Sequence, residues 1–364
     1  MIGAAGDIGR RVVRSLIMLG VPTADLLVAG RRPEVLPEVL GSASSTGRRV
    51  DVNDPRGLTA FAGDVDLVID ATGPSHERAL TTARLVGRAG AHLVSVGGPA
   101  DARTVSSLEP PGDRRVLMYA GALPGVSGIV ARAALLDDPG TATLEVCAGG
   151  RGAFTLAGAE DYLAGLDHGD VRPLAGWRSG RPLLGGVERR EAVTLPEFPE
   201  TVTLFPFLDA EGEQIAQGHG LREATWYSAM VGDEMTHLLR LVAGLGVAAG
   251  AVRLRDATTA MAAGRRPYVV IRARTRSRQL VLRSPGEAAL AGVMAAAAAV
   301  EVLAGAVAPG ASAASQALDP TRVLELLTCP GSQTTVLRSV LPPPETLTEL
   351  GVRWTETEME EGEL

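Results

Sequence analysis

The chain opens with "MIGAAGDIGRRVVRSLI" (residues 1–17), in which Gly3, Gly6 and Gly9 recur at three-residue spacing. An apolar, arginine-containing helical pattern follows directly. Small residues at this spacing let a backbone approach a pyrophosphate, and the start of the helix offers free N–H groups and a positive dipole end. The stretch therefore predicts a dinucleotide-binding turn. Its predicted cofactor-binding residues are Gly3, Ala5, Gly6, Asp7, Ile8 and Gly9.

Such a turn normally follows a buried strand, yet only Met1 and Ile2 precede the first glycine. A first strand of this kind contributes about five residues to the sheet. We therefore expect Met1 and Ile2 to be the end of that strand, and the natural protein to begin several residues upstream. The alternative is that two residues suffice, with other segments or water satisfying the neighbouring strands.

The first third of the chain alternates strand-like and helical segments. Amphipathic helical stretches, such as 9–20 and 75–89, separate short apolar runs, and the connections are rich in glycine or proline. This alternation predicts a parallel sheet covered on both faces, a Rossmann doubly wound α/β domain over residues 1–125. The predicted strands cover residues 26–30, 48–52, 65–73, 91–98 and 114–121.

The pattern changes after a helix predicted at 123–138. We expect an inserted α+β substrate domain over 126–284, with a mainly antiparallel sheet and helices on one side. Its predicted strands are 141–150, 201–208, 223–232, 250–259 and 268–284, and its predicted helices are 153–165 and 233–245. Residues 285–364 are expected to return to the first domain through helices at 286–305 and 319–328, before a frayed acidic tail.

Composition excludes several classes of mechanism and partner. The 364 residues contain no lysine, so all 35 basic residues are arginine, and Schiff-base or lysine general-acid chemistry is excluded. A net charge of −7 argues against nucleic acid as the main partner. The two cysteines, Cys147 and Cys329, show no metal-ligand spacing. No metal site is expected, and a reducing cytoplasm is the expected location.

One apolar segment has the length of a membrane span. The run "AALAGVMAAAAAVEVLAGAVA" (288–308) is mostly alanine and glycine, which insert weakly into bilayers, and it contains Glu301. We interpret it as a buried, closely packed helix, and expect no membrane association.

The ends of the later strands carry the remaining cofactor candidates. The second strand ends at Arg31 and Arg32, where NAD-preferring sites carry a carboxylate. Two guanidiniums suit the 2′-phosphate of NADP(H). Asp51 and Asn53 close the next strand and are expected near the adenine. The predicted nicotinamide contacts are Thr72, Gly73, Pro74 and Gly97.

Five segments appear in a familiar order. They are "GAAGDIGRRV", "LLVAGRR", "VDVND", "DLVIDATGPS" and "YAGALPGVSGIVARAAL". Over residues 1–138 the chain resembles the saccharopine dehydrogenase-like family of NAD(P)-dependent oxidoreductases, and more loosely beyond. The resemblance implies a Rossmann domain with an inserted substrate domain, and often a homodimer. It also implies redox chemistry at a carbon–nitrogen bond, which we expect to be the reduction of an imine, or the oxidation of a secondary amine, in a small carboxylated metabolite.

A second resemblance gives an alternative function. The opening also resembles atypical short-chain dehydrogenases, whose catalytic members need a Tyr-x-x-x-Lys pair that this chain cannot supply. The alternative is a non-catalytic, NADP(H)-responsive binding protein of that type. The long β-rich second domain favours the oxidoreductase.

The second domain offers few candidates for the chemical step. Segment 149–169 follows a strand, turns at glycines and opens a helix whose start, with Arg151, is a candidate carboxylate-binding site. Asp161, Tyr162 and His168 lie on or just after that helix and are the candidate proton donors or orienting groups.

Two further patterns have more ordinary interpretations. Trp226 and Tyr227 are expected on opposite faces of a strand, most simply as core residues. Four arginines at period two are expected to share a solvated strand face, or alternatively to bind an acidic substrate or partner. They are Arg272, Arg274, Arg276 and Arg278.

Overall fold

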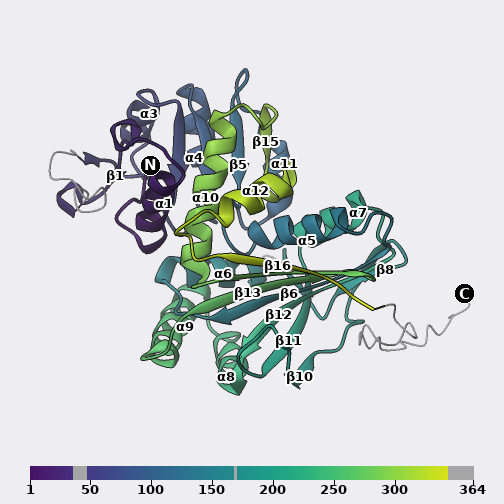
Figure 1. Cartoon of the computed structure of the whole chain (residues 1–364). Helices are drawn as coiled ribbons and strands as arrows, with labels where there is room; N and C mark the ends of the chain where they lie inside the picture. The colour runs from purple at the N-terminus through teal and green to yellow at the C-terminus, as the bar shows by residue number, and fades with distance from the viewer. Residues whose placement is uncertain (36–46, 168–169, 343–364) are drawn as a thin grey trace, which may run out of the picture.

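Two β-sheets organise the chain (Figure 1), and the computed structural model describes residues 1–35, 47–167 and 170–342. The first sheet is parallel and runs in the order β15-β5-β4-β3. Through Ile2 it continues to β1 and β2. Its strands are β1 (Ala29–Gly30), β2 (Arg48–Arg49), β3 (Leu67–Asp70), β4 (His92–Ser95), β5 (Arg115–Met118) and β15 (Gly310–Ala313).

The first two residues occupy the central strand position of this sheet. Ile2 forms parallel bridges to Asp70 on one side and Ala29 on the other. Its N–H donates to the Ile69 carbonyl at 2.9 Å, and the Met1 amine donates to the Leu27 carbonyl at 2.8 Å. The two residues therefore serve as the strand that the glycine turn requires. The upstream start stays a prediction.

Helices cover both faces of the parallel sheet. On one face, α3 (Pro55–Ala62) and α4 (Ala79–Arg88) enclose a core that includes Phe61 and Leu93. On the other face, α1 (Asp7–Met18) and α10 (Glu287–Leu303) enclose Val12 and Ile69. The predicted Rossmann doubly wound α/β architecture is confirmed. No helix of the described ranges has the length and apolarity of a membrane span, and α10 is the buried helix that its alanines predict.

The second sheet is mixed and has the order β10-β11-β12-β6-β13-β14-β16. Within this order β6 and β12 pair in parallel and the other neighbours are antiparallel. Three short strands, β7 (Arg172–Pro173), β8 (Gly176–Arg178) and β9 (Arg181–Leu183), flank it. The main strands are β6 (Thr143–Arg151), β10 (Arg190–Val193), β11 (Val202–Leu208), β12 (Glu223–Val231), β13 (Tyr268–Arg274), β14 (Arg278–Ser284) and β16 (Thr335–Val340).

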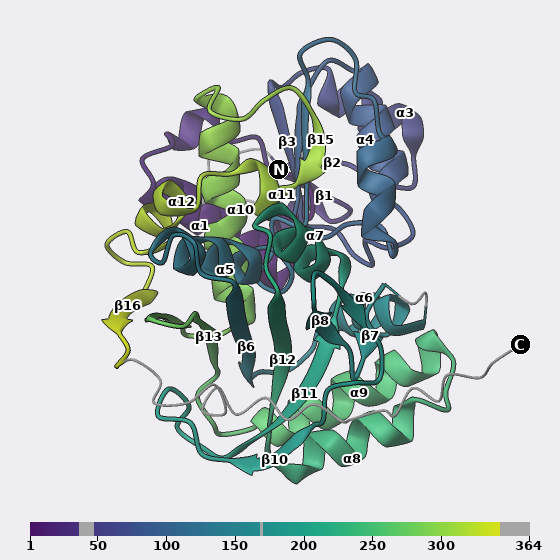
Figure 2. The same cartoon turned by 90° about the vertical axis from the view of Figure 1, so that its right-hand side faces the viewer.

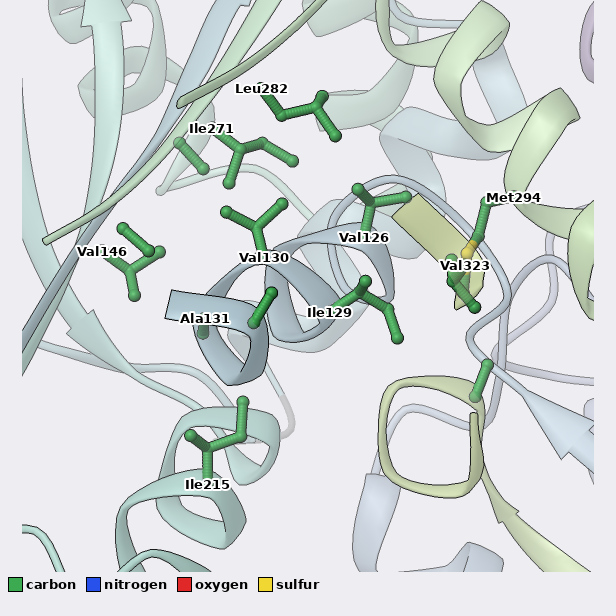
Figure 3. Close-up of a cluster of buried hydrophobic side chains, with 14 of the residues drawn as sticks. Val126, Ile129, Val130, Ala131, Val146, Ile215, Ile271, Leu282, Met294 and Val323 are labelled. Atoms are coloured by element: carbon green, nitrogen blue, oxygen red, sulfur yellow. The ribbon is translucent and has the colours of Figure 1, made fainter. Parts of the chain in front are cut away.

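Helix α5 (Val126–Leu136) joins the two sheets through a shared core. Its side chains Ile129 and Val130 are fully buried. Figure 3 shows α5 between strand residues such as Ile271 and helix residues such as Met294. The remaining helices are α6 (Leu156–Asp167), α7 (Ala210–Gly218), α8 (Gly232–Val242), α9 (Val247–Ala262), α11 (Ala314–Ala317) and α12 (Pro320–Leu327), and three 3₁₀ turns cover Thr23–Asp25, Pro33–Val35 and Ala102–Ser107.

Two predicted elements are wrong. Residues 250–259 form part of helix α9, because Gly250, Leu254 and Thr258 are buried at a four-residue spacing. Segment 268–284 is a β-hairpin, because its strand ends at Arg274 and the chain turns before β14. The C-terminal segment returns to the first domain as predicted, but it also contributes a strand to each sheet, β15 and β16.

The arginines of this hairpin do not share one solvated strand face. Arg276 lies in the turn between the strands, whereas Arg272 is buried and pairs with Glu145 (2.5 Å) and Glu197 (3.5 Å). The opposite-face expectation for Trp226 and Tyr227 is confirmed, because they belong to the core clusters on the two sides of the sheet.

Candidate functional site

The glycine turn between Ile2 and α1 has no room for side chains at two of its three glycines. Gly3 has φ +75°, and a Cβ there would lie 2.8 Å from the Ala71 carbonyl carbon. A Cβ on Gly9 would lie 2.1 Å from the Gly3 carbonyl oxygen. The tight turn thus holds the start of α1 against the central strand, which leaves a bare backbone surface for a ligand.

The start of α1 offers unsatisfied donors at this surface. Gly6 is the N-cap and has no side chain to accept from the first-turn N–H groups, which lack partners within the helix. Asp7 pairs with Arg11 at 3.2 Å, so its negative charge is offset. Arg10 donates to the Ala5 carbonyl at 3.1 Å, which places a guanidinium beside the turn. These groups fit a pyrophosphate.

The far end of the dinucleotide site is rich in arginine. Arg31 and Arg32 directly follow β1, and both are exposed. Neither arginine forms a salt bridge with any residue that the structure describes. Arg49, also exposed, pairs in register with Gly30 and adds a third guanidinium to this strand end. The sequence predicted only Arg31 and Arg32 here. Arg49 was missed because the pairing of β1 with β2, which brings it to this strand end, is a tertiary contact.

Asp51 and Asn53 form a turn of their own at the end of the next strand. The Asp51 carboxylate accepts from the Asn53 N–H at 3.0 Å, and both residues are exposed. Their predicted role near the adenine stays a prediction.

The predicted nicotinamide contacts lie together at the carboxyl ends of β3 and β4. The buried Asp70 accepts from the Thr72 N–H at 2.8 Å and from its hydroxyl at 2.6 Å. Desolvation raises the pKa of Asp70, which the bonds from Thr72 oppose. A Cβ at Gly97 would lie 2.1 Å from the Ser75 hydroxyl, so this glycine is needed for the close approach of the two strand ends.

Helix α6 brings Asp161 to this point from the second domain. Its carboxylate accepts from the Ser75 N–H (2.8 Å), the Ser75 hydroxyl (3.0 Å) and the His76 N–H (3.0 Å). It also lies 2.7 Å from His76 Nδ1. A Cβ at Gly73 would be 2.6 Å from the Ala157 Cβ on the same helix. The structure thus unites Asp161 with the Thr72–Pro74 loop.

His76 is a functional candidate that the sequence analysis missed. Its side chain is 14% exposed, and Asp161 holds one ring nitrogen, so the other nitrogen is the one placed to exchange a proton. Nε2 lies 3.9 Å from Glu77 Oε1. The histidine follows the predicted nicotinamide loop by two residues, which was the available sequence signal. Its partner is 85 residues away, so the pair itself left no local pattern.

The other second-domain candidates lie in different surroundings. Tyr162 packs against Phe154 with ring centroids 5.5 Å apart, and burial raises its pKa to about 12, which makes it a weak acid. Arg151 forms an ion pair with Glu200 and lies over the ring of Tyr268 at 5.7 Å. Within the described residues, neither side chain forms a hydrogen bond or ion pair with Asp161. His168 lies outside the described residues.

Arg78, at the start of α4, is a second missed candidate. Its positive charge lowers the pKa of Asp70, so it lies close to the end of β3. Its Nε is buried and finds no hydrogen-bond partner in the part of the chain that the structure describes. An arginine in this state is suited to an anionic group of a cofactor or substrate.

A small acidic cavity of about 60 Å³ lies beyond β5, between the domains. Tyr119, Asp170, Asp209 and Glu211 are among its lining residues. Burial, reinforced by neighbouring carboxylates, raises the pKa of Asp170 to about 6 and that of Glu211 to about 7. Burial and the carboxylates around it, Asp161 included, also raise the pKa of Tyr119. This cavity favours cationic over anionic groups.

Glu211 also connects three segments of the two domains. It accepts from the Gly125 N–H at 3.0 Å and from the hydroxyls of Ser127 and Ser315, both at 2.6 Å. These donors belong to the start of α5 and to α11. No cluster of three or more potential metal ligands occurs within the described ranges.

Comparisons with known proteins agree with the fold. Residues 1–110 match the family model described as the saccharopine dehydrogenase NADP binding domain. Apo saccharopine dehydrogenase (L-Glu forming) from Saccharomyces cerevisiae superposes with a TM-score of 0.69 at 14% identity, covering 94% of this chain and 99% of the yeast chain. No curated protein matches the sequence.

A second solved structure shares the fold. Homospermidine synthase from Legionella pneumophila, in complex with NAD, gives a TM-score of 0.56 at 13% identity and covers 93% of this chain and 90% of its own. Residues 1–110 therefore match the saccharopine dehydrogenase NADP-binding domain, and the whole chain shares the fold of yeast saccharopine dehydrogenase.

Proposed function

We propose that the protein is an NADP(H)-dependent oxidoreductase that reduces an imine, or oxidises the corresponding secondary amine, in a small carboxylated metabolite. The observation that carries the proposal is the contact of Asp161 with His76 and Ser75, beside the Thr72–Pro74 loop. An ionisable pair at that loop would lie beside the predicted position of the nicotinamide.

In this proposal each residue has a separate role in the reaction. When bound, NADPH supplies the hydride for the carbon of the C=N bond. His76 supplies the proton at the nitrogen, and Asp161 fixes the ring so that Nε2 points away from the carboxylate. In the reverse direction His76 removes that proton from the secondary amine. The Gly3–Gly9 turn and the start of α1 hold the pyrophosphate.

Charge supports the choice of cofactor and substrate. The exposed Arg31, Arg32 and Arg49 suit a 2′-phosphate, which supports NADP(H) over NAD(H). The acidic cavity suits the cationic nitrogen end of an amine or iminium. Arg78, with its buried Nε, is the better-placed group for a substrate carboxylate, because Arg151 is already paired with Glu200.

NADPH oxidation with mixtures of 2-oxo acids and primary amines, and with preformed cyclic imines, tests this function. We expect turnover with at least one imine, and a loss of about 10²–10⁴-fold in kcat for His76→Gln, the usual contribution of a general acid. NADPH binding, followed by nicotinamide fluorescence, should be unchanged in the variant. Wild-type protein that binds NADPH but turns over no imine would favour the NADP(H)-responsive binding protein.

A further inference from the structure

Strand β3 ends in a buried carboxylate, Asp70. This residue lies between Ile2 and Ser95 in the parallel sheet and is 5% exposed. Figure 2 shows this sheet above the second domain, with α6 below it. A carboxylate is costly to bury unless hydrogen bonds and nearby positive charge compensate it. The contacts of Asp70 with the loop that follows the strand explain its position.

Asp70 fixes the direction of the Thr72 hydroxyl. Its Oδ1 accepts from the Thr72 N–H at 2.8 Å and lies 2.6 Å from the Thr72 Oγ1. Because Oδ1 already accepts from the N–H, it is an unprotonated oxygen, and the hydroxyl is the donor of the second bond. A hydroxyl has one proton and two lone pairs. With its proton donated to Asp70, the Thr72 hydroxyl can only accept from a ligand.

Thr72 lies directly against the glycine turn. A Cβ at Gly3 would be 3.0 Å from the Thr72 backbone nitrogen, and Thr72 is itself partly exposed. The hydroxyl therefore lies between the turn that holds the pyrophosphate and the loop predicted to hold the nicotinamide. A ligand at this point meets a side-chain oxygen that accepts and does not donate.

The rest of the loop has few free donors. The Ser75 N–H and hydroxyl already donate to Asp161. Gly73 is exposed, and its N–H has no hydrogen-bond acceptor among the described residues. The loop thus offers a ligand a side-chain acceptor at Thr72 and a backbone donor at Gly73. A primary carboxamide carries the matching groups, an NH2 and a C=O.

We propose that Asp70 is a positioning residue for the cofactor, because it holds the Thr72 hydroxyl as an acceptor for the carboxamide NH2 of the nicotinamide. The proposal rests on the position of the nicotinamide in the proposed function, but not on the substrate or on proton transfer by His76. Asp70 acts only through Thr72. The same hydroxyl orientation disfavours a cofactor ring whose substituent can accept hydrogen bonds but not donate them.

Binding of cofactor analogues tests this direction of the hydrogen bond. Isothermal titration calorimetry compares NADP⁺ with its thionicotinamide analogue, which keeps an NH2 group, and with its 3-acetylpyridine analogue, in which a methyl group replaces the NH2. We expect wild type to bind the thionicotinamide analogue like NADP⁺. The acetylpyridine analogue should bind about five- to tenfold more weakly, the usual effect of one lost hydrogen bond.

Variants separate the role of Thr72 from that of Asp70. Thr72→Val should lower NADP⁺ affinity to that of the acetylpyridine analogue, whereas Thr72→Ser should keep the wild-type preference. Asp70→Ala frees the hydroxyl to donate, so the preference for an NH2 group should disappear. Asp70→Asn keeps an acceptor for Thr72 and should retain the preference.

Thr59→Val is the matched control, because the Thr59 hydroxyl also donates, to the Pro55 carbonyl at 2.7 Å within α3. It should bind all three cofactors like wild type, and far-UV circular dichroism and Tm will show that each variant folds. Equal wild-type affinity for NADP⁺ and the acetylpyridine analogue would overturn the proposal.

An equal loss of affinity for both ligands in Thr72→Val, or a preference that survives in Asp70→Ala, would also overturn it. These measurements need no imine. The expected pattern of affinities without turnover of any imine would therefore support the role of Asp70 and refute only the proposed reaction.

Discussion

The glycine turn and the Asp161–His76 pair represent two ways in which this molecule builds its candidate site. The turn is local, because Gly3 and Gly9 are only six residues apart. Their backbones lie too close together for a Cβ on Gly9, and this contact fixes the start of α1. The pair is not local, because α6 of the second domain approaches a loop that precedes it by 85 residues.

The two regions also differ in how they are held. The turn is fixed by backbone packing: the Gly6 N–H donates to the Gly3 carbonyl at 3.0 Å, and Gly9 lies directly against that carbonyl. The pair is fixed by four hydrogen bonds to a single carboxylate. We infer that substitutions in the turn affect folding and cofactor binding together, whereas substitutions in the pair affect the chemical step.

The largest expected loss of stability comes from the turn. Gly9→Ala places a Cβ 2.1 Å from the Gly3 carbonyl oxygen, so the backbone must shift. We expect a cost of about 3 kcal/mol, the upper end for overpacking, together with loss of NADPH binding. Gly63→Ala is the control, because Gly63 has helical φ and a Cβ there would meet atoms no closer than 3.5 Å. Equal urea midpoints for the two variants would contradict this account of the turn.

The same contrast explains what the sequence could predict. The turn, the alternation of strands and helices and the buried alanine helix all follow from local patterns, and the structure has each of them. Segment 250–259 was mistaken for a strand, although its buried residues have helical spacing. Asp161 was identified from its place on a helix after a strand. His76 was missed, because its importance depends on a contact between domains.

The buried ion pair between Arg272 and Glu145 also could not be predicted from the sequence. Alternating arginines usually mark a solvated face, and nothing within the hairpin indicates the carboxylates on the neighbouring strand and covering segment. The positions of Arg49 beside Gly30 and of Arg78 near Asp70 also depend on tertiary contacts that no local pattern indicates.

The next prediction concerns cofactor preference and the two arginines that follow β1. Arg31→Ala combined with Arg32→Ala should weaken NADPH binding by about 2–3 kcal/mol, because charge-assisted hydrogen bonds to the 2′-phosphate are lost. NADH binding should change little. Fluorescence titration with both cofactors measures the difference, and Arg56→Ala, an exposed arginine on α3, is the control. Equal weakening of NADPH and NADH binding would refute the assignment.

A smaller effect is expected from Glu211, which lies in neither region and joins α7 to the start of α5 and to α11. Desolvation raises its pKa from 4.5 to about 7, so the folded protein binds a proton that the unfolded chain releases between these pH values. This contribution to stability is present at low pH and is lost as the pH rises through 7. Between pH 5.5 and 7.5 the loss is about 2 kcal/mol, at about 1.4 kcal/mol per pKa unit.

Glu211→Gln should remove this pH dependence while keeping the contacts with Gly125 and the two serines. Urea unfolding at several pH values measures it. Wild type and variant should therefore differ in the slope of unfolding free energy against pH, with the wild type losing more stability as pH rises. Parallel slopes would show that the carboxyl does not titrate in this range.

A double-mutant cycle on His76 and Asp161 tests the central claim most directly, that residues from both domains act as one catalytic unit beside a separately held cofactor. Single-turnover NADPH oxidation is measured for wild type, His76→Gln, Asp161→Asn and the double variant, with NADPH affinity in parallel. The account predicts that the double variant is about as slow as His76→Gln alone, because Asp161 acts through the histidine, and that NADPH affinity is unchanged throughout. Multiplied losses of rate in the double variant, or NADPH affinity that falls with the rate, would contradict it.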